Sequence, residues 1–397
     1  MLTTTGLRLG TLGLGIGLGI HLLYKSRWLS TISRAAYHPL QDAGSHPVRK
    51  ALMDAVSRGR TRVWPPQIKE VNGQTRLPVK GGLKVEDLAY RSERGGSSQA
   101  WVPLRIMSST TEGKGVRKPV VIFLHPTGHS MRTEHEKQES YAAAGYLTVA
   151  IDCRYHGERC PAVPGQEPRQ VYQEAIVRAW REGPERPFLL DNVWDILALL
   201  DYLCTRPDVD TSRIGITGTS LGGMHSWLAT VLDSRIAVSA PMIGVQSFNF
   251  AVESGQFQGR VESISNVFSA AQSDMGKSSL DSEVVAAVWR KIMPGLLEAY
   301  DAGQSLPLIA PRPLLVANGE LDHRCPMEGV YPVWKVTQAA YMTAYRQEHP
   351  GSSKEAAEQA VAQLLKLYVE PGVGHKETPG MNKEIRQFMD QHLLKKQ

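Results

Sequence analysis

Short apolar runs alternate with helix-like segments along most of this chain. Runs of strand length lie at Pro119–Leu124, Tyr146–Ile151, Arg213–Thr217, Arg235–Ile243, Pro313–Asn318 and Lys366–Glu370. Between them, apolar side chains recur at helical spacing, most clearly over Leu190–Cys204. Strands that alternate with helices form a mostly parallel sheet with helices on both faces, so the pattern predicts an α/β fold.

The remaining patterns add a hairpin, shorter helices and a long insert. Leu83–Arg91 and Ala100–Met107 flank Gly95-Gly96 and predict a β-hairpin ahead of the parallel strands. Further helices are expected at His46–Val56, Glu134–Ala144, Ala175–Trp180 and Gly223–Leu232. The stretch 244–311 joins two strands and is too long for a plain crossover, so we predict a helical insert between the late strands.

The segment Gly218-Thr219-Ser220-Leu221-Gly222 lies between a predicted strand and a predicted helix. A G-x-S-x-G turn in this context is typical of a nucleophile elbow, which raises the serine hydroxyl above the sheet on a strained turn. The Leu221 amide then lies at a helix N-terminus, where it can donate to an oxyanion. The alternative is a glycine-rich turn whose serine only caps the helix.

A catalytic serine needs a histidine to take its proton and an acid to orient that histidine. Asp322 follows the strand Pro313–Asn318 and is the predicted acid, with Glu320 as the second candidate. His375 follows the last strand on a glycine-rich loop and is the predicted base. The alternatives are an Asx turn at Asp322 and an exposed loop histidine at His375.

An oxyanion hole needs a second amide donor besides Leu221. The strand Pro119–Leu124 leads into His125-Pro126-Thr127-Gly128, and Pro126 has no N–H to donate. We therefore predict the amide of Thr127 as the second donor, with Gly128 as the fallback. His125 is expected to form structural hydrogen bonds.

With these motifs, the chain resembles members of the α/β-hydrolase superfamily, closest in style to dienelactone hydrolases, acetyl-xylan-esterase-like enzymes and prolyl-oligopeptidase-like serine hydrolases. The resemblance covers roughly residues 83–395 and implies that Ser220, Asp322 and His375 form the triad of an α/β-hydrolase fold. It rests on His125-Pro126-Thr127-Gly128, Asp152-Cys153-Arg154-Tyr155-His156-Gly157, the elbow, Gly319-Glu320-Leu321-Asp322 and Gly374-His375. Pro126 departs from the family, in which a second glycine is common there.

The insert carries large apolar side chains at Phe248, Phe250, Phe257, Phe268, Trp289, Met293 and Tyr300. They either pack additional helices onto the core or form a cap over the serine that shapes the substrate pocket, and the two roles are compatible.

The composition argues against a metalloprotein and against a nucleic-acid-binding protein. The four cysteines have neither C-x-x-C nor zinc-ligand spacing, so we expect free thiols, no metal and no cofactor. The net charge is +6, and aromatics are not interleaved with the basic residues, which argues against nucleic-acid binding. Much of the basic excess lies at Arg8, Lys25, Arg27, Arg34, Arg49, Lys50, Arg58, Arg60, Arg62, Lys69, Arg76 and Lys80, as in an organelle address or a contact with an anionic membrane.

Residues 1–24 form an apolar segment followed by Lys25 and Arg27. It is interpreted as a membrane anchor with the catalytic domain on the cytosolic side, as a transit peptide for a plastid or mitochondrion, or as a secretory signal. Residues 25–80 are expected to be a linker with one short helix, and residues 81–397 the catalytic domain, with the insert at 244–311.

The predicted activity is that of a cofactor-independent serine hydrolase that cleaves a small-molecule carboxylic ester. A thioesterase, lactonase or peptidase would use the same residues. A hydrolase-fold protein that binds a small molecule without turnover is the alternative outside the enzymes.

Overall fold

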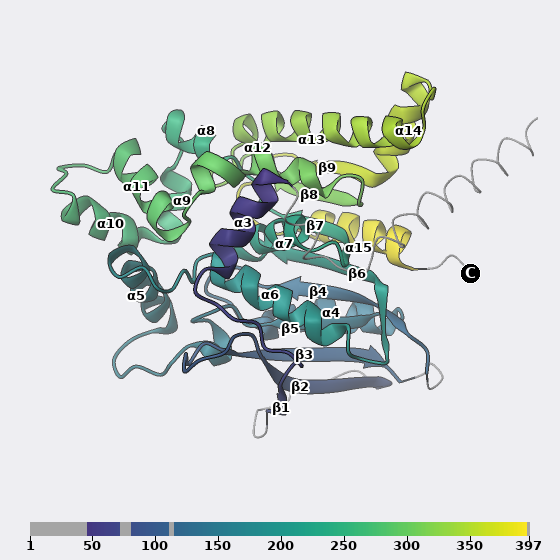
Figure 1. Cartoon of the computed structure of the whole chain (residues 1–397), viewed down its shortest axis with the longest axis horizontal. Coiled ribbons are helices and arrows are strands. Elements are labelled where there is room, and N and C mark those ends of the chain that lie inside the picture. The colour runs from purple at the N-terminus through teal and green to yellow at the C-terminus, as the bar shows by residue number, and fades with distance from the viewer. Residues whose placement is uncertain (1–45, 72–80, 111–114, 395–397) are drawn as a thin grey trace, which may run out of the picture. The chain divides into compact units, whose positions relative to one another are not determined.

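The computed structural model describes residues 46–71, 81–110 and 115–394 (Figure 1). In these ranges the strands form one nine-stranded sheet in the order β1-β2-β3-β5-β4-β6-β7-β8-β9. Their bounds are β1 Ile68–Glu70, β2 Leu83–Arg91, β3 Trp101–Ser109, β4 Lys118–Leu124, β5 Leu147–Ile151, β6 Val209–Thr219, β7 Ile236–Met242, β8 Leu314–Gly319 and β9 Leu365–Glu370.

The sheet is parallel from β5 to β9 and antiparallel from β1 to β5. The predicted hairpin is confirmed by β2 and β3, in which Tyr90 pairs with Val102. Leu124 at the end of β4 pairs with Gly218 near the end of β6. The loops that follow the parallel strands therefore leave the sheet at one edge, where ligands bind in open α/β folds.

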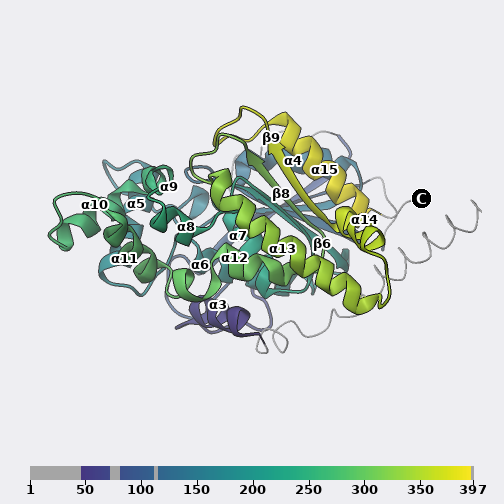
Figure 2. The same cartoon turned by 90° about the horizontal axis from the view of Figure 1, so that it is seen from above.

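Helices cover both faces of the sheet (Figure 2). Helices α4 (His135–Ala143) and α15 (Pro379–Leu393) lie on one face, and α6 (Leu190–Leu203), α7 (Leu221–Leu232) and α13 (Met327–Glu348) lie on the other. The central strands are mostly apolar because both faces of the sheet are buried, and every residue of β4 is buried. The predicted fold class is confirmed.

The insert between β7 and β8 is helical and lies with α5 (Pro168–Arg181) at one end of the sheet (Figures 1 and 2). Its helices are α8 Phe248–Glu253, α9 Gln258–Ser263, α10 Ser265–Asp274, α11 Ser282–Ile292 and α12 Ala302–Ser305. Phe248 and Phe268 of the insert, and Phe188 ahead of α6, surround Trp289 at centroid distances of 5.1, 5.3 and 5.7 Å, so this cluster also joins the insert to the core.

Two helices differ from the expected pattern. Helix α5 begins at Pro168 rather than near Ala175, because Pro168 suits the first helical turn and Glu167 and Gln170 form a capping box. Between β8 and β9 there are two helices rather than one, α13 and α14 (Lys354–Leu364). Pro350 and Gly351, with φ of +85° at the glycine, separate them.

The segment ahead of β1 packs on the catalytic core. Helix α3 (Pro47–Ser57) buries Leu52 and Val56 completely and contacts α6 and α7. Just beyond it, Arg62 forms an ion pair of 2.9 Å with Asp201 of α6. Residues 1–24, for which the sequence favours an anchor or targeting segment, lie outside the described residues. No helix in the described ranges has the length and apolar character needed to cross a membrane.

Candidate active site

The elbow residue Ser220 occupies a strained backbone conformation between β6 and α7, with φ of 55° and ψ of −105°. The neighbouring glycines allow the chain to turn there. A Cβ on Gly218 would lie 2.6 Å from the backbone carbon of Gly222, and a Cβ on Gly222 would lie 2.1 Å from the Leu124 carbonyl oxygen. Real Cβ atoms do not approach so closely, so this turn requires glycine at both positions.

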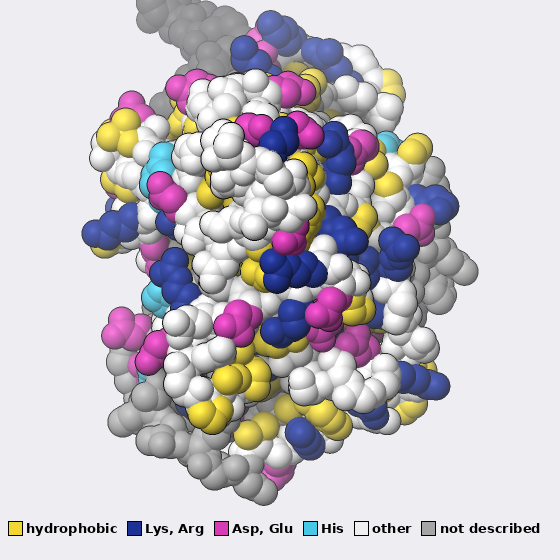
Figure 3. All heavy atoms as spheres, turned by 90° about the vertical axis from the view of Figure 1, so that its left-hand side faces the viewer, with side chains coloured by type: hydrophobic (Ala, Val, Ile, Leu, Met, Phe, Trp, Pro, Cys, Tyr) yellow, Lys and Arg dark blue, Asp and Glu magenta, His cyan; other side chains and the backbone are white. Residues whose placement is uncertain are grey.

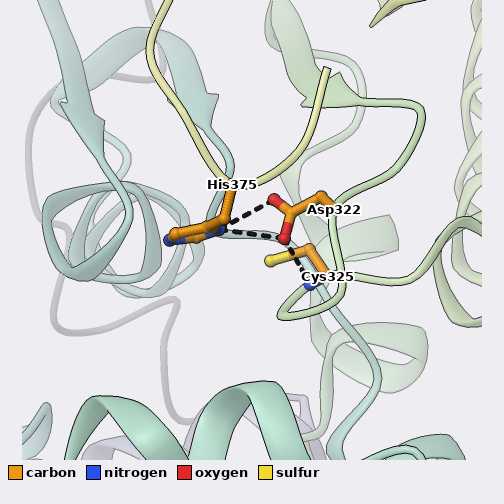
Figure 4. Close-up of side chains that lie close together, drawn as sticks. All are labelled: Asp322, Cys325 and His375. Carbon is orange, nitrogen blue, oxygen red and sulfur yellow. Dashed lines mark hydrogen bonds and ion pairs between the residues drawn. The ribbon is translucent and has the colours of Figure 1, made fainter. Parts of the chain in front are cut away.

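The three residues predicted as a triad lie together, although they come from three separate loops. Ser220 Oγ lies 2.7 Å from His375 Nε2. His375 Nδ1 lies 2.9 and 2.8 Å from the two carboxylate oxygens of Asp322 (Figure 4). The Asp322 side chain is fully buried, and Ser220 is 7% exposed, so the hydrogen-bonded chain runs from the interior toward the surface.

Glu320, the second candidate acid, points elsewhere. Its carboxylate accepts a hydrogen bond of 2.8 Å from the amide of Gly372, on the loop ahead of His375. Only Asp322 among the two candidates contacts the imidazole.

The local environment holds Asp322 ionised and His375 neutral near pH 7. Burial raises the pKa of the Asp322 carboxyl, but the bond with His375 and two backbone amides bring it below its ordinary value overall. Burial lowers the pKa of His375, and this effect outweighs the opposing effect of Asp322. A neutral imidazole can accept a proton from the serine hydroxyl.

The two predicted oxyanion donors belong to adjacent loops. Leu221 is the first residue of α7, where amides have no partner within the helix. Thr127 lies in a turn closed by the His129 amide, which donates to the Pro126 carbonyl at 3.2 Å. That turn has φ of +79° at Gly128 and does not use the amide of Thr127.

His125 forms structural hydrogen bonds, as expected. Its ring is completely buried, Nε2 accepts from the Cys153 amide at 3.0 Å, and Nδ1 lies 2.8 Å from the Pro126 carbonyl. Burial lowers the pKa of His125 to about 4, so it stays neutral.

The sequence pattern missed the residues that hold the acid in place. The amides of Arg324 and Cys325 donate to Asp322 Oδ1 at 2.8 and 3.1 Å. The Cys325 thiol donates to the carbonyl of Ile243, which has the unusual φ of 44° for a β-branched residue. From the insert, Arg260 contacts the Cys325 sulfur at 3.4 Å. No spacing in the sequence relates Arg260 to Cys325, so this contact appears only in the structure.

Glu377 was also missed, and it connects the histidine loop to the elbow. Its carboxylate accepts from Thr219 Oγ1 at 2.7 Å and pairs with Lys137 of α4 at 3.0 Å. Burial raises the pKa of Glu377, but Lys137 and the hydrogen-bond donors bring it below its ordinary value. No spacing rule relates residues 137, 219 and 377, so this network appears only in three dimensions.

Asp322, Cys325 and His375 each offer a possible metal-ligand atom, and these atoms lie within 4.8 Å of one another (Figure 4). A metal ion bound there would take His375 Nδ1 away from Asp322. The cluster therefore suits the hydrogen-bonded pair of Asp322 and His375 better than a resident metal. All four cysteines are free thiols.

Comparison with known proteins agrees with the fold. A family model for acetyl xylan esterase matches residues 78–254, and one for fungal glucuronyl esterase matches residues 184–344. Both matched ranges contain Ser220. Together with the sheet order and the elbow, they decide the family. The chain belongs to the α/β-hydrolase superfamily. It is a hydrolase of the carboxylesterase type.

Individual relatives of this hydrolase are distant. YtaP of Bacillus subtilis (strain 168), named as a hydrolase, is 24% identical over 69% of this chain and 79% of its own length. Acetyl xylan esterase 1 from Thermoanaerobacterium sp. JW/SL YS485 has a TM-score of 0.59 at 18% identity, over 90% of this chain and 99% of the other. A glucuronoyl esterase from Solibacter usitatus has a TM-score of 0.54 at 14% identity, over 88% and 92%. These structural matches show the shared fold.

Proposed function

We propose that this protein is a serine esterase that cleaves a carboxylic ester through an acyl-enzyme on Ser220. The observation that carries the proposal is the unbroken chain of short contacts from Ser220 Oγ through His375 to Asp322. A buried carboxylate that orients a neutral imidazole against a serine hydroxyl is the arrangement that activates serine as a nucleophile.

In the proposed mechanism, Ser220 Oγ attacks the ester carbonyl carbon while His375 Nε2 takes the hydroxyl proton. The amides of Leu221 and Thr127 stabilise the oxyanion of the tetrahedral intermediate. His375 then returns the proton to the leaving alcohol as the C–O bond breaks. A water molecule, deprotonated by His375, attacks the acyl-enzyme, and His375 returns that proton to Ser220 Oγ as the acyl–oxygen bond breaks and the carboxylic acid is released. Asp322 stabilises the imidazolium in each half-reaction.

The substrate we propose is a small ester of a carbohydrate. Both family models that match the chain carry the names of carbohydrate esterases, one acting on acetyl groups of xylan and one on glucuronyl esters. The buried position of Ser220 beside a helical insert also favours a small group at the acyl position. An acetylated monosaccharide is therefore the first substrate to examine.

The test combines covalent labelling with turnover. A fluorophosphonate should label the wild-type protein and leave the Ser220→Ala variant unlabelled. Nitrophenyl esters of increasing acyl length should give the highest kcat/KM with acetate, and an acetylated monosaccharide should release acetate. Labelling without any product from esters, thioesters or lactones would instead support a small-molecule-binding protein that retains a reactive serine.

A further inference from the structure

A cavity of about 770 Å³ lies away from the catalytic residues, between four segments that are distant in the sequence. These are residues 58–60 after α3, 93–97 after β2, 182–186 between α5 and α6, and 290–294 at the end of α11. None of Ser220, Asp322 and His375 lines it. Cavities of this volume accept ligands of metabolite size.

Part of the cavity is lined by a buried network of ion pairs that contains equal numbers of arginines and carboxylates. Arg60 pairs with Glu93 at 3.0 Å and also with Asp191, and Arg154 pairs with Asp195 at 3.1 Å. Arg159 pairs with Asp195 as well, at 2.8 Å. Three arginines thus face three carboxylates, and one of these, Asp191, also accepts a hydrogen bond of 2.7 Å from the backbone amide of Arg186.

Arg186 lines the same cavity but has no such partner. It is 3% exposed, and its guanidinium forms no ion pair with any described residue. Nη2 donates to the Arg58 carbonyl at 2.9 Å, whereas the buried Nε has no hydrogen-bond partner among the described residues. Burial lowers the pKa of Arg186 and the nearby cation of Arg60 lowers it further, and the attraction of Asp191 offsets these effects only in part. A buried cation beside other cations is costly unless an anion compensates it.

The rim of the cavity adds positive charge. Arg58, Arg94 and Lys291 line it, are exposed, and form no ion pair with a described residue. The acidic residues on the rim are Glu182 and Glu185, and Glu185 accepts a hydrogen bond from the Tyr155 hydroxyl. Figure 3, which views the end of the protein that carries α10 and α11, shows lysine and arginine side chains across the middle of this face, with acidic side chains between them.

Glycines next to two of these cations in the sequence also line the cavity. Gly95 and Gly96 have no other atom within 4 Å of the place where a Cβ would lie, and the same holds for Gly59. A ligand can therefore approach the main chain closely at these glycines. Arg58 and Arg60 also belong to the basic excess of the first 80 residues, for which the sequence favours an organelle address or a membrane contact.

We propose that this cavity binds a small molecule with at least two anionic oxygen groups, phosphate or carboxylate, with Arg186 as the buried cation and Arg58, Arg94 and Lys291 around the opening. Guanidinium groups bind both kinds of oxyanion through paired N–H donors. This proposed site is separate from the proposed esterase site. Its test therefore measures ligand binding and not esterase activity.

The test is calorimetric titration of the full chain with inorganic pyrophosphate and, separately, with citrate, at matched ionic strength. We expect one saturable site for at least one of them. The Arg94→Gln/Lys291→Gln double variant should bind at least about tenfold more weakly, which corresponds to about 1.4 kcal/mol. Both positions are exposed, so this variant should fold normally. Tighter binding of pyrophosphate would identify a phosphorylated ligand, and tighter binding of citrate a polycarboxylate.

The matched control is Arg346→Gln, which removes an exposed arginine from α13, outside the cavity. It should leave the affinity unchanged. Arg186→Gln should abolish binding, and its thermal unfolding shows whether it is folded. Absence of saturable binding for both anions would overturn the proposal. Equal affinity in the double variant and the wild type would overturn it too, whatever the activity of Ser220.

Discussion

Arg260, on helix α9 of the insert, donates a hydrogen bond to the sulfur of Cys325, three residues after Asp322. The same guanidinium donates to the carbonyl of Arg324 at 3.3 Å. Since the amides of Arg324 and Cys325 hold the Asp322 carboxylate, the insert contacts the loop that positions the proposed acid. We therefore expect the insert to help position the proposed acid, whether or not it also forms a cap.

The contact between insert and acid loop can be tested at Gly259. A Cβ there would lie 2.4 Å from the His323 ring and 2.6 Å from the His323 carbonyl oxygen. We expect Gly259→Ala to destabilise the protein by about 1–3 kcal/mol, because the loop that carries Asp322 and His323 must move to make room for the added methyl group. The same movement should lower kcat. Denaturant unfolding and steady-state kinetics measure the two effects.

Gly303→Ala is the control for that substitution. Gly303 lies in α12, and the nearest atom to its Cβ position is Val333 Cγ2 at an ordinary 4.0 Å. Alanine there should leave kcat unchanged and keep or slightly raise stability. If both variants behave alike, the close approach at Gly259 has no bearing on catalysis.

Replacement of Ser220, the proposed nucleophile, should change catalytic activity without changing stability much. Ser220→Ala should lower kcat by about 10⁶-fold with little change in the unfolding midpoint. Ser220→Gly should be equally inactive but more stable than Ser220→Ala by about 1 kcal/mol, because glycine relieves the strained φ of 55°. Retention of a tenth of the wild-type activity in either variant would show that Ser220 is not the nucleophile.

Substitutions of the two candidate acids should cause different losses of activity. Asp322→Asn should lower kcat by about 10⁴-fold, since the amide favours the wrong histidine tautomer. Glu320→Gln should have a small effect, because Glu320 bonds to the Gly372 amide and not to His375. A larger loss in Glu320→Gln than in Asp322→Asn would reassign the acid.

The dependence of kcat/KM on pH follows from the environment of His375. The imidazole must be neutral to accept the serine proton, and burial lowers its pKa below the ordinary value of about 6.5. Activity should therefore fall only at pH values below about 6.5, where His375 becomes protonated. Arg260 also lowers this pKa, so Arg260→Gln should move the acid limb to higher pH. An acid limb above pH 7 in the wild type would contradict this prediction.

Local patterns were enough to predict the strands, most helices and the meeting of residues 220, 322 and 375, because the carboxyl ends of parallel strands share one edge. Glu320 and Asp322 follow the same strand and both were candidates, and in the structure Asp322 is the one that contacts His375. The contacts of Arg260, Cys325 and Glu377 were not predictable, since each joins segments with no common periodicity. The same holds for Arg60, whose partner Asp191 lies far along the chain.

The last prediction concerns residues 1–24, which we propose to be a membrane anchor or an organelle address. The described structure begins at His46, and α3 already packs on the core, so a deletion of residues 1–24 removes none of the described contacts. We expect the shortened protein to keep its esterase activity and its unfolding midpoint, while its distribution between membrane and soluble cell fractions changes. N-terminal sequencing of the mature full-length protein separates the two proposals. An anchor keeps residues 1–24, whereas a transit peptide is removed and the mature chain starts well after Tyr24. If the full-length protein keeps its first residues and stays wholly in the soluble fraction, both proposals fail.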